Sequence, residues 1–146
     1  MECEFPGENA TTEEIKEILK NNKTIAIVGL SADEEKDSYR VAKYMKQHGY
    51  KIIPVNPKYK NILGERSYPD LKSVPEKIDI VDIFRRPDAI PYIVDESLKI
   101  HAKVIWMQLG LCSNASAEKA RAAGLKVVMN KCIKVEHAKM LIKNDY

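Results

Sequence analysis

The sequence is short of cysteine, of long apolar runs and of net charge. Its three cysteines, Cys3, Cys112 and Cys132, are an odd number without a CxxC pair, which supports neither a disulfide framework nor a zinc ribbon. No uncharged apolar stretch reaches the ~20 residues of a membrane-spanning helix, and the start Met1-Glu2-Cys3-Glu4 is acidic where a secretion signal is basic. The net charge of +3 is too small to indicate nucleic acid as a partner. We therefore expect a cytoplasmic protein that uses neither a membrane nor nucleic acid.

What is present is the pattern of one α/β domain. The chain has 146 residues, 45% of them hydrophobic, which is enough for one core. Five short apolar segments have the length and composition of buried strands. They cover residues 23–29, 51–55, 78–84, 104–107 and 126–129.

Amphipathic helical segments separate these strands. The first begins at Thr11, where Thr11 and Glu14 have capping-box spacing, and the last covers residues 133–143. Between them we expect a helix ended by Gly49, a helix after Pro87, and a helix over residues 115–123 capped by Asn114 or Ser116.

Alternation of this kind requires a parallel sheet with helices on both faces. It predicts a Rossmann-like, doubly wound α/β fold of about five strands in three layers, forming a single domain. We expect residues 1–22 to be a helical extension packed on a Rossmann-like domain over residues 23–146. Such folds bind ligands at the carboxyl edge of the sheet, so the segments that directly follow the strands are the candidate site.

Gly29 ends the first strand and has two interpretations. It could open a phosphate-binding loop whose amide groups, with Ser31 and Ser38, hold a pyrophosphate, or it could be a turn glycine at the end of a strand. The dinucleotide fingerprint GxGxxG is absent, since Ser31 and Glu34 stand where its later glycines would be. No acidic residue follows the second strand at Asn56, so an NAD site is disfavoured.

Four cations also follow strands, namely Lys36, Arg40, Arg85 and Arg86. They could converge on one polyphosphate, because the arginine fork matches phosphate geometry. They could equally be solvated surface charges, which is the usual place of such side chains.

Catalytic and metal-binding patterns are not visible in the sequence. His48, His101 and His137 fall in or at the ends of expected helices, and no His, Cys and carboxylate set has metal spacing. There is no GxSxG elbow and no Walker loop. From the residues alone we infer a binder of a phosphate-rich nucleotide.

Several longer motifs stand in order between residues 23 and 141. They are IVGLS at 27–31, KDSYRVA at 36–42, GYKIIPVNP at 49–57, GE at 64–65, DIVDIFRR at 79–86, VIWMQLG at 104–110 and CIKVEH at 132–137. In these motifs the sequence resembles the stand-alone CoA-binding protein family, which is related to the CoA-binding domain of succinyl-CoA synthetase. The chain departs from that family with Lys36 where arginine is common, and with Asn130-Lys131 in place of Asp-Arg.

The resemblance implies that coenzyme A lies across the carboxyl edge. It places the phosphates on Gly29, Leu30, Ser31, Lys36, Ser38 and Arg40. It places the nucleotide between two groups of residues, Val55, Asn56, Pro57 and Lys58 on the adenosine side and Phe84, Arg85, Arg86 and Pro87 on the other. Gln108 and Gly110 are implied to lie nearer the pantetheine arm.

Three functions remain open on this basis. The first, which we favour, is non-catalytic binding of CoA or acyl-CoA, as a carrier, a regulator or a split-synthetase-like subunit, with a second copy or a partner subunit left open. The second is an enzyme or redox protein acting on the CoA thiol or thioester through Cys132, with Lys131 nearby, although Cys132 could also be a buried structural cysteine. The third is an NAD-type nucleotide-binding domain.

Overall fold

A computed structural model, which describes residues 7–144, contains one parallel five-stranded sheet. Its strands are β1 (Thr24–Val28), β2 (Lys51–Val55), β5 (Ile80–Ile83), β6 (Val104–Met107) and β7 (Lys126–Val128). Their order across the sheet is β2-β1-β5-β6-β7, and every neighbouring pair is parallel. The predicted Rossmann-like fold is confirmed, because sequential βα units joined by crossovers build this order.

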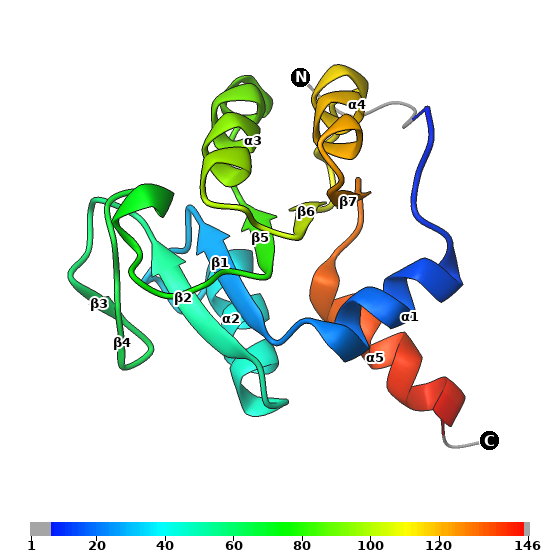
Figure 1. The fold of residues 1–146 in the computed structure, drawn as a ribbon. Coiled ribbons are helices and arrows are strands. Elements are labelled where there is room, and N and C mark those ends of the chain that lie inside the picture. The colour runs from blue at the N-terminus through cyan, green and yellow to red at the C-terminus, as the bar shows by residue number, and fades with distance from the viewer. Residues whose placement is uncertain (1–6, 145–146) are drawn as a thin grey trace.

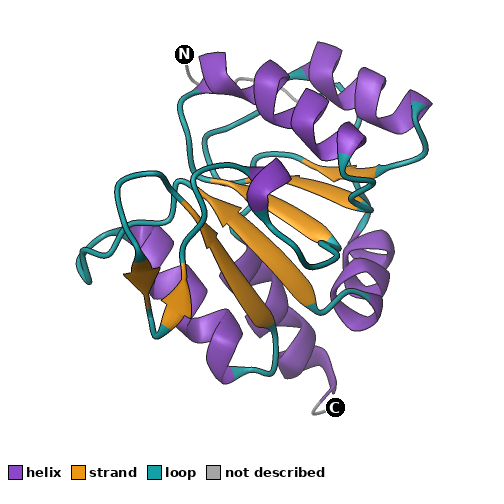
Figure 2. Cartoon of the chain, turned by 60° about the vertical axis from the view of Figure 1, so that its left-hand side comes forward, coloured by secondary structure: helices purple, strands orange, loops and turns teal. Residues whose placement is uncertain are grey.

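Five α-helices cover the two faces of the sheet and complete three layers (Figures 1 and 2). They are α1 (Thr12–Asn21), α2 (Asp37–Gln47), α3 (Ile90–Lys99), α4 (Asn114–Ala122) and α5 (Ile133–Asn144). Helices α3 and α4 lie on one face, and α1, α2 and α5 lie on the other. Alternate residues of each strand therefore enter different cores: Ile25 and Ile27 pack towards α1, α2 and α5, whereas Ala26 and Val28 pack towards α3 and α4.

The helix starts follow capping chemistry. Thr11 caps α1 as predicted: its hydroxyl accepts from the Glu14 amide at 3.1 Å, and the Glu14 carboxylate accepts from the Thr11 amide at 3.0 Å. For α4 the predicted cap was wrong. Ser113, not Asn114 or Ser116, has the extended backbone of an N-cap, and its hydroxyl accepts from the Ser116 amide at 3.2 Å.

A small hairpin was not predicted. It pairs β3 (Asn61–Ile62) with β4 (Glu65–Arg66) and lies beside β2 (Figure 2). Two-residue strands carry no readable periodicity, and the turn has Leu63 where the common signal has asparagine. Both turn residues have positive φ, 55° for Leu63 and 76° for Gly64. The Lys46 ammonium donates to the Leu63 carbonyl at 2.6 Å and so ties the hairpin to α2. Two 3₁₀ turns, η1 (Leu71–Ser73) and η2 (Pro87–Ala89), complete the described elements.

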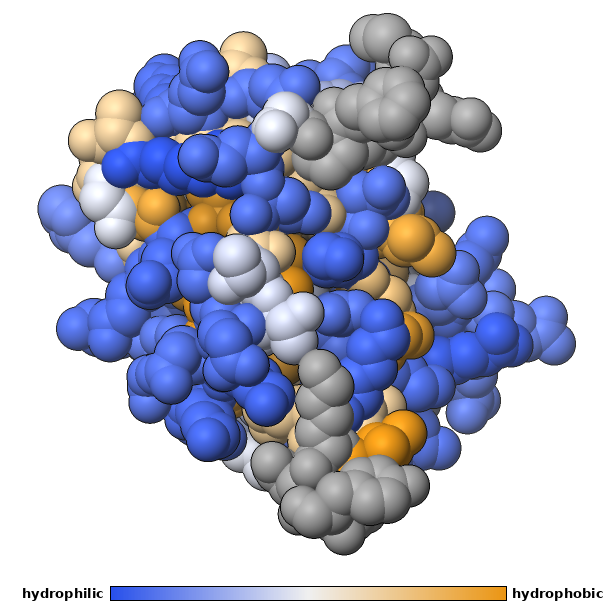
Figure 3. Space-filling model, turned by 90° about the vertical axis from the view of Figure 1, so that its right-hand side faces the viewer, coloured by the Kyte–Doolittle hydropathy of each residue, from blue (hydrophilic) through white to orange (hydrophobic). Residues whose placement is uncertain are grey.

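The segment before the sheet shares its core. Ile15, Ile18 and Leu19 of α1 are buried with the side chains of β1 and α5. Further upstream, the Asn9 side chain exchanges two hydrogen bonds with the backbone of Met129, of 2.8 and 2.9 Å, beside the edge strand β7. The outward face of this region is mainly hydrophilic with separate apolar patches (Figure 3). In the part of the chain that the structure describes, no helix has the length and apolar character needed to cross a membrane.

Candidate functional site

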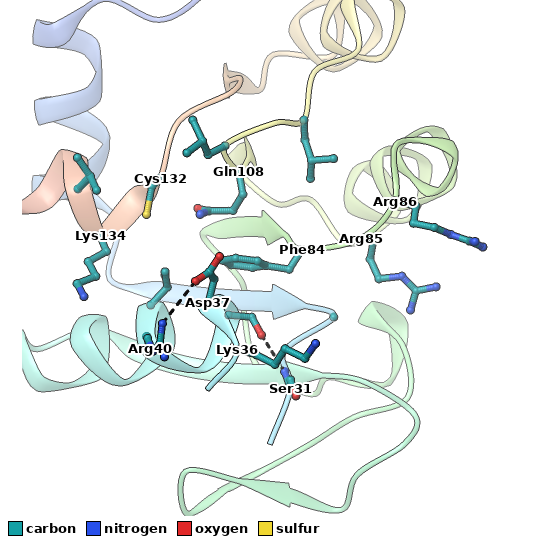
Figure 4. Close-up of a pocket in the computed structure, with 16 residues that line it drawn as sticks. Ser31, Lys36, Asp37, Arg40, Phe84, Arg85, Arg86, Gln108, Cys132 and Lys134 are labelled. Carbon is teal, nitrogen blue, oxygen red and sulfur yellow. Dashed lines mark hydrogen bonds and ion pairs between the residues drawn. The ribbon is translucent and has the colours of Figure 1, made fainter. Parts of the chain in front are cut away.

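A pocket of about 1000 Å³ opens at the carboxyl edge of the sheet (Figure 4). It lies where β1 and β5 are neighbours, between the N-terminal ends of α2 and α5. Helix α2 leaves β1 for one face of the sheet and α3 leaves β5 for the other, so the loops separate there and leave a crevice. Its lining comprises Gly29, Ser31, Lys36, Asp37, Ser38, Arg40, Val41, Phe84, Arg85, Arg86, Gln108, Leu109, Leu111, Cys132, Lys134 and Val135.

Gly29 is required by the backbone itself. Its φ is +91°, and a Cβ atom at this position would collide with the carbonyl oxygen of Phe84. Its amide donates to the Val55 carbonyl at 2.9 Å, so this N–H group is already used by the sheet. The need for a glycine at the end of β1 therefore follows from the backbone geometry. Without a side chain at position 29, the ends of β1 and β5 can lie close together.

The loop after Gly29 is held by its own serines. The Ser38 hydroxyl accepts from the Ser31 amide at 3.0 Å, and the Ser31 hydroxyl accepts from the Asp33 amide at 3.0 Å. Unused backbone donors lie at the start of α2. The amides of Asp37 and Ser38 have no hydrogen-bond partner in the described residues. An uncapped helix N-terminus at the pocket favours an anion there.

The four predicted cations all line this one pocket, and Lys134 joins them from α5. Arg40 lies 3.9 Å from Asp37, and Arg86 lies 3.8 Å from Asp88, in ion pairs whose side chains are largely exposed. Exposed pairs of this length hold a cation weakly, so these guanidinium groups remain available to another anion. Lys36 and Arg85 form no ion pair within the described residues, so the pocket offers several cations that a polyphosphate can engage.

Uncharged side chains line the part of the pocket around Gln108, next to Lys134 of α5. In Figure 4, Gln108 and Cys132 lie on the opposite side of the Phe84 ring from Arg85 and Arg86. The Gln108 side-chain oxygen accepts from the Ile133 amide at 3.1 Å, which fixes the amide and leaves its Nε2 donors without a partner among the described residues. Leu109, Leu111 and Val135 contribute apolar side chains to the lining.

The cysteines have three different situations. Cys132 is a free thiol, partly buried, that lines the pocket and packs against the core beneath α5. Both earlier interpretations of Cys132 therefore describe part of its environment. Cys112 is disulfide-bonded, although the odd number and the spacing of the cysteines did not support a disulfide framework. Cys3 lies outside the described residues.

Ten of the predicted site residues line the pocket and seven do not. The seven are Leu30, Val55, Asn56, Pro57, Lys58, Pro87 and Gly110. Leu30 and Val55 are buried in the two cores. The Asn56 side chain connects the ends of β1 and β2, donating to the Leu30 carbonyl at 3.0 Å and accepting from the Lys58 amide at 3.0 Å. The Gly110 amide donates to Asn130 at 2.7 Å. Contact of these seven with a ligand stays a prediction.

Sequence reasoning did not select six of the lining residues, namely Asp37, Val41, Leu109, Leu111, Lys134 and Val135. The last two belong to the first turn of α5. The only signal was the shortness of the loop after the last strand. Sequence reasoning also passed over Asp82 on β5, outside the pocket lining, whose side chain is fully buried and whose two oxygens have no hydrogen-bond partner within residues 7–144. Burial raises the pKa of this carboxyl well above its usual value. A carboxylate inside the apolar strand Ile80–Ile83 was the available signal.

Comparison with known proteins agrees with this architecture. YneT, an uncharacterized protein of Bacillus subtilis, is 42% identical over 131 residues, which cover 90% of this chain and 97% of YneT. The structure of a hypothetical protein from Pyrococcus horikoshii superimposes with a TM-score of 0.88 and 41% identity, and the match covers 97% of this chain and 99% of that one.

Larger proteins match over a smaller share of their length. An ADP-forming acetate–CoA ligase of Methanocaldococcus jannaschii is 35% identical over 74 residues, which cover 51% of this chain and 10% of the ligase. A dinucleotide-forming acetyl-coenzyme A synthetase of Candidatus Korarchaeum cryptofilum superimposes with a TM-score of 0.66 and 25% identity, over 76% of this chain and 26% of that one. The sequence pattern of the CoA binding domain matches residues 23–138. The chain therefore belongs to the CoA-binding domain family, as its motifs and its pocket had indicated.

Proposed function

We propose that this protein binds coenzyme A or acyl-CoA in the pocket at the carboxyl edge of its sheet. The observation that carries the proposal is the convergence of Lys36, Arg40, Arg85 and Arg86 on one pocket of a domain from this family. Arginine and lysine side chains and free helix amides suit the phosphates of the nucleotide. The uncharged side chains around Gln108 suit the uncharged pantetheine arm.

We propose further that binding is non-catalytic, as a carrier, a regulator or a subunit of a larger assembly. Within residues 7–144, no group of three or more His, Cys, Asp or Glu side chains is placed to hold a metal. His137 lies outside the pocket lining. The alignment covers only 10% of the M. jannaschii ligase, so it gives no ground for transferring the ligase reaction to this chain. A relative in Pyrococcus furiosus is named as an alpha subunit, which supports a search for a partner by co-purification.

A thermal-shift and calorimetry panel tests the ligand. The probes are CoA, acetyl-CoA, NAD and ATP, and we expect saturable binding of the first two and weaker binding of the others. A ligand at a hundredfold excess over its dissociation constant stabilises the folded state by about 2.7 kcal/mol, which a melting curve resolves. No saturable binding of CoA or acetyl-CoA at millimolar concentration would refute the proposal, and tighter binding of NAD would favour the nucleotide-binding alternative.

A second candidate function rests on the free thiol of Cys132 in the pocket wall. In this function the Cys132 thiolate attacks CoA disulfide, forms a protein–CoA mixed disulfide and releases one CoA thiolate. Incubation with CoA disulfide should then add the mass of one CoA to the folded protein and none to a Cys132→Ser variant. An unmodified protein that still binds CoA would eliminate this function and leave simple binding.

A further inference from the structure

Asp82 is an unusual residue for the middle of a sheet. It lies on β5 between Ile27 of β1 and Trp106 of β6, and its side chain is fully buried. Neither carboxyl oxygen has a hydrogen-bond partner among the residues that the structure describes. Burying a polar group without a partner destabilises the folded state, so such groups are rare in native proteins and call for a functional explanation.

The position of Asp82 relates it to the pocket. Asp82 and Phe84 are two residues apart on one strand segment and point to the same face of the sheet, about 7 Å apart along the strand. Phe84 and Gln108 both line the pocket. Gln108 lies two residues after Trp106 on β6, just as Phe84 lies two residues after Asp82 on β5. Asp82 and Trp106 therefore form the layer of side chains directly beneath Phe84 and Gln108.

Two polar side chains of the neighbouring strand segment are oriented by other bonds. The Trp106 indole N–H donates to the Lys131 carbonyl at 2.8 Å, and the Gln108 oxygen accepts from the Ile133 amide. The Gln108 Nε2 donors have no partner among the described residues and do not bond to Asp82. What lies above it is the Phe84 ring, which Figure 4 shows projecting into the middle of the pocket. Asp82 is not a lining residue, so a ligand atom in the pocket reaches its carboxyl only if a side chain above it, such as Phe84, changes position.

We propose that Asp82 is an inner binding residue of this pocket, which hydrogen-bonds to an amide carbonyl of the ligand's pantetheine arm when the Phe84 ring moves aside. The inference rests on the proposed function, because it presumes that the ligand is CoA or an acyl-CoA. It adds a recognition element for the arm, separate from the cations that suit the phosphates.

The chemistry of the buried carboxyl fits an uncharged arm. Because burial favours its protonated form, Asp82 offers an O–H donor, and an amide carbonyl is a matching acceptor. Affinity for the arm should then fall as the pH rises through the pKa of Asp82, since deprotonation removes the donor and leaves a buried charge. Other titratable or charged groups lie on the elements around the pocket, and a pH dependence has to be separated from theirs. They are Lys36, Asp37, Arg40 and Tyr44 on and before α2, Arg85 and Arg86 after β5, and Cys132, Lys134, Glu136 and His137 on and before α5.

Two substitutions separate Asp82 from these groups. Asp82→Asn keeps the shape and an N–H donor but does not titrate, whereas Asp82→Val removes all hydrogen bonding. Each variant and the wild type is titrated calorimetrically with CoA and with adenosine 3′,5′-bisphosphate, which lacks the arm, across the pH range in which the protein stays folded.

We expect Asp82→Val to bind CoA about tenfold more weakly than the wild type, which corresponds to the loss of one hydrogen bond. The variant should bind adenosine 3′,5′-bisphosphate as tightly as the wild type does. Asp82→Asn should bind CoA nearly as the wild type does and lack the decline at high pH. Equal CoA binding by all three proteins would overturn the inference, as would an equal loss for both ligands, which indicates a purely structural role. Failure of the wild type to bind CoA at all would instead overturn the proposed function.

Discussion

The carbonyl oxygen of Phe84 occupies the place that a Cβ atom at position 29 would need. The two residues follow the adjacent strands β5 and β1, and the Phe84 amide donates to the Val28 carbonyl at 2.8 Å. This backbone contact brings the Phe84 side chain and Arg85 next to the loop that leads to α2. The close approach therefore shapes the pocket floor, and it makes position 29 intolerant of any side chain.

Replacement of this glycine tests the contact. Gly29→Ala should destabilise the protein by more than about 3 kcal/mol, because it combines a positive φ with a backbone clash. Gly49→Ala is the matched control, since Gly49 has nearly the same φ, +90°, but no atom within 4 Å of an added Cβ. It should cost about 1–2 kcal/mol, the conformational penalty alone. Urea unfolding measures both, and equal losses would show that the Phe84 carbonyl imposes no constraint.

The arginines after β5 should contribute electrostatically to ligand binding. Arg85→Ala combined with Arg86→Ala should weaken CoA binding about tenfold at low salt, the sum expected for two exposed charge contacts. The loss should shrink at high salt, because solvent-exposed contacts are screened. The control is Lys72→Ala with Lys77→Ala, which removes the same charge from exposed positions outside the pocket lining. A comparable loss in the control would indicate a general charge effect.

The order and type of the main elements could be predicted because their signals are local. Strands β2 and β6 begin and end where expected, since continuous apolar runs bounded by glycine, proline or polar residues mark buried strands. Strands of the hairpin could not be predicted, because β3 and β4 have two residues each. Ser113 was missed as a cap because Ser113, Asn114 and Ser116 lie within four residues and all have side chains that cap helices.

The candidate site was predictable only in part. The carboxyl-edge rule located Phe84, Gln108 and the cations, because it depends on chain order alone. The rule does not predict that the Asn56 side chain donates a hydrogen bond to the Leu30 carbonyl, or that the Val55 side chain is buried in the core. Such choices depend on side-chain packing between segments far apart in the chain. The missing hydrogen-bond partner of Asp82 is likewise visible only in three dimensions.

Asp82 should also make the stability of the free protein depend on pH. Its pKa is raised in the folded state by burial, so the folded state binds the proton more tightly than the unfolded state. Stability is then greatest below the unfolded pKa of 3.8 and falls as the pH rises towards the folded pKa. The free energy of unfolding of the wild type, relative to Asp82→Asn, should therefore decline with rising pH. A constant difference between the two proteins would mean that Asp82 does not titrate as burial requires.

A second buried titratable group, His137, lies between α2 and α5. Its Nδ1 atom is 2.9 Å from the Tyr44 hydroxyl, and its ring packs edge-on against His48 and Tyr50 with centroids 5.1 and 5.5 Å away. Burial lowers the pKa of His137, and the nearby His48 and Lys23 lower it further. The folded protein therefore favours the neutral imidazole at this helix junction.

Acidification should weaken that junction. Because the unfolded state takes up the proton more readily, the stabilisation is present above the unfolded pKa of 6.5 and is lost as the pH falls towards the lower folded pKa. Unfolding curves across this window should show a steeper loss for the wild type than for His137→Asn. His101→Asn is the control, because His101 is exposed and asparagine tolerates its positive φ. If His137→Asn loses stability as steeply as the wild type, protonation of His137 does not weaken the junction and the prediction fails.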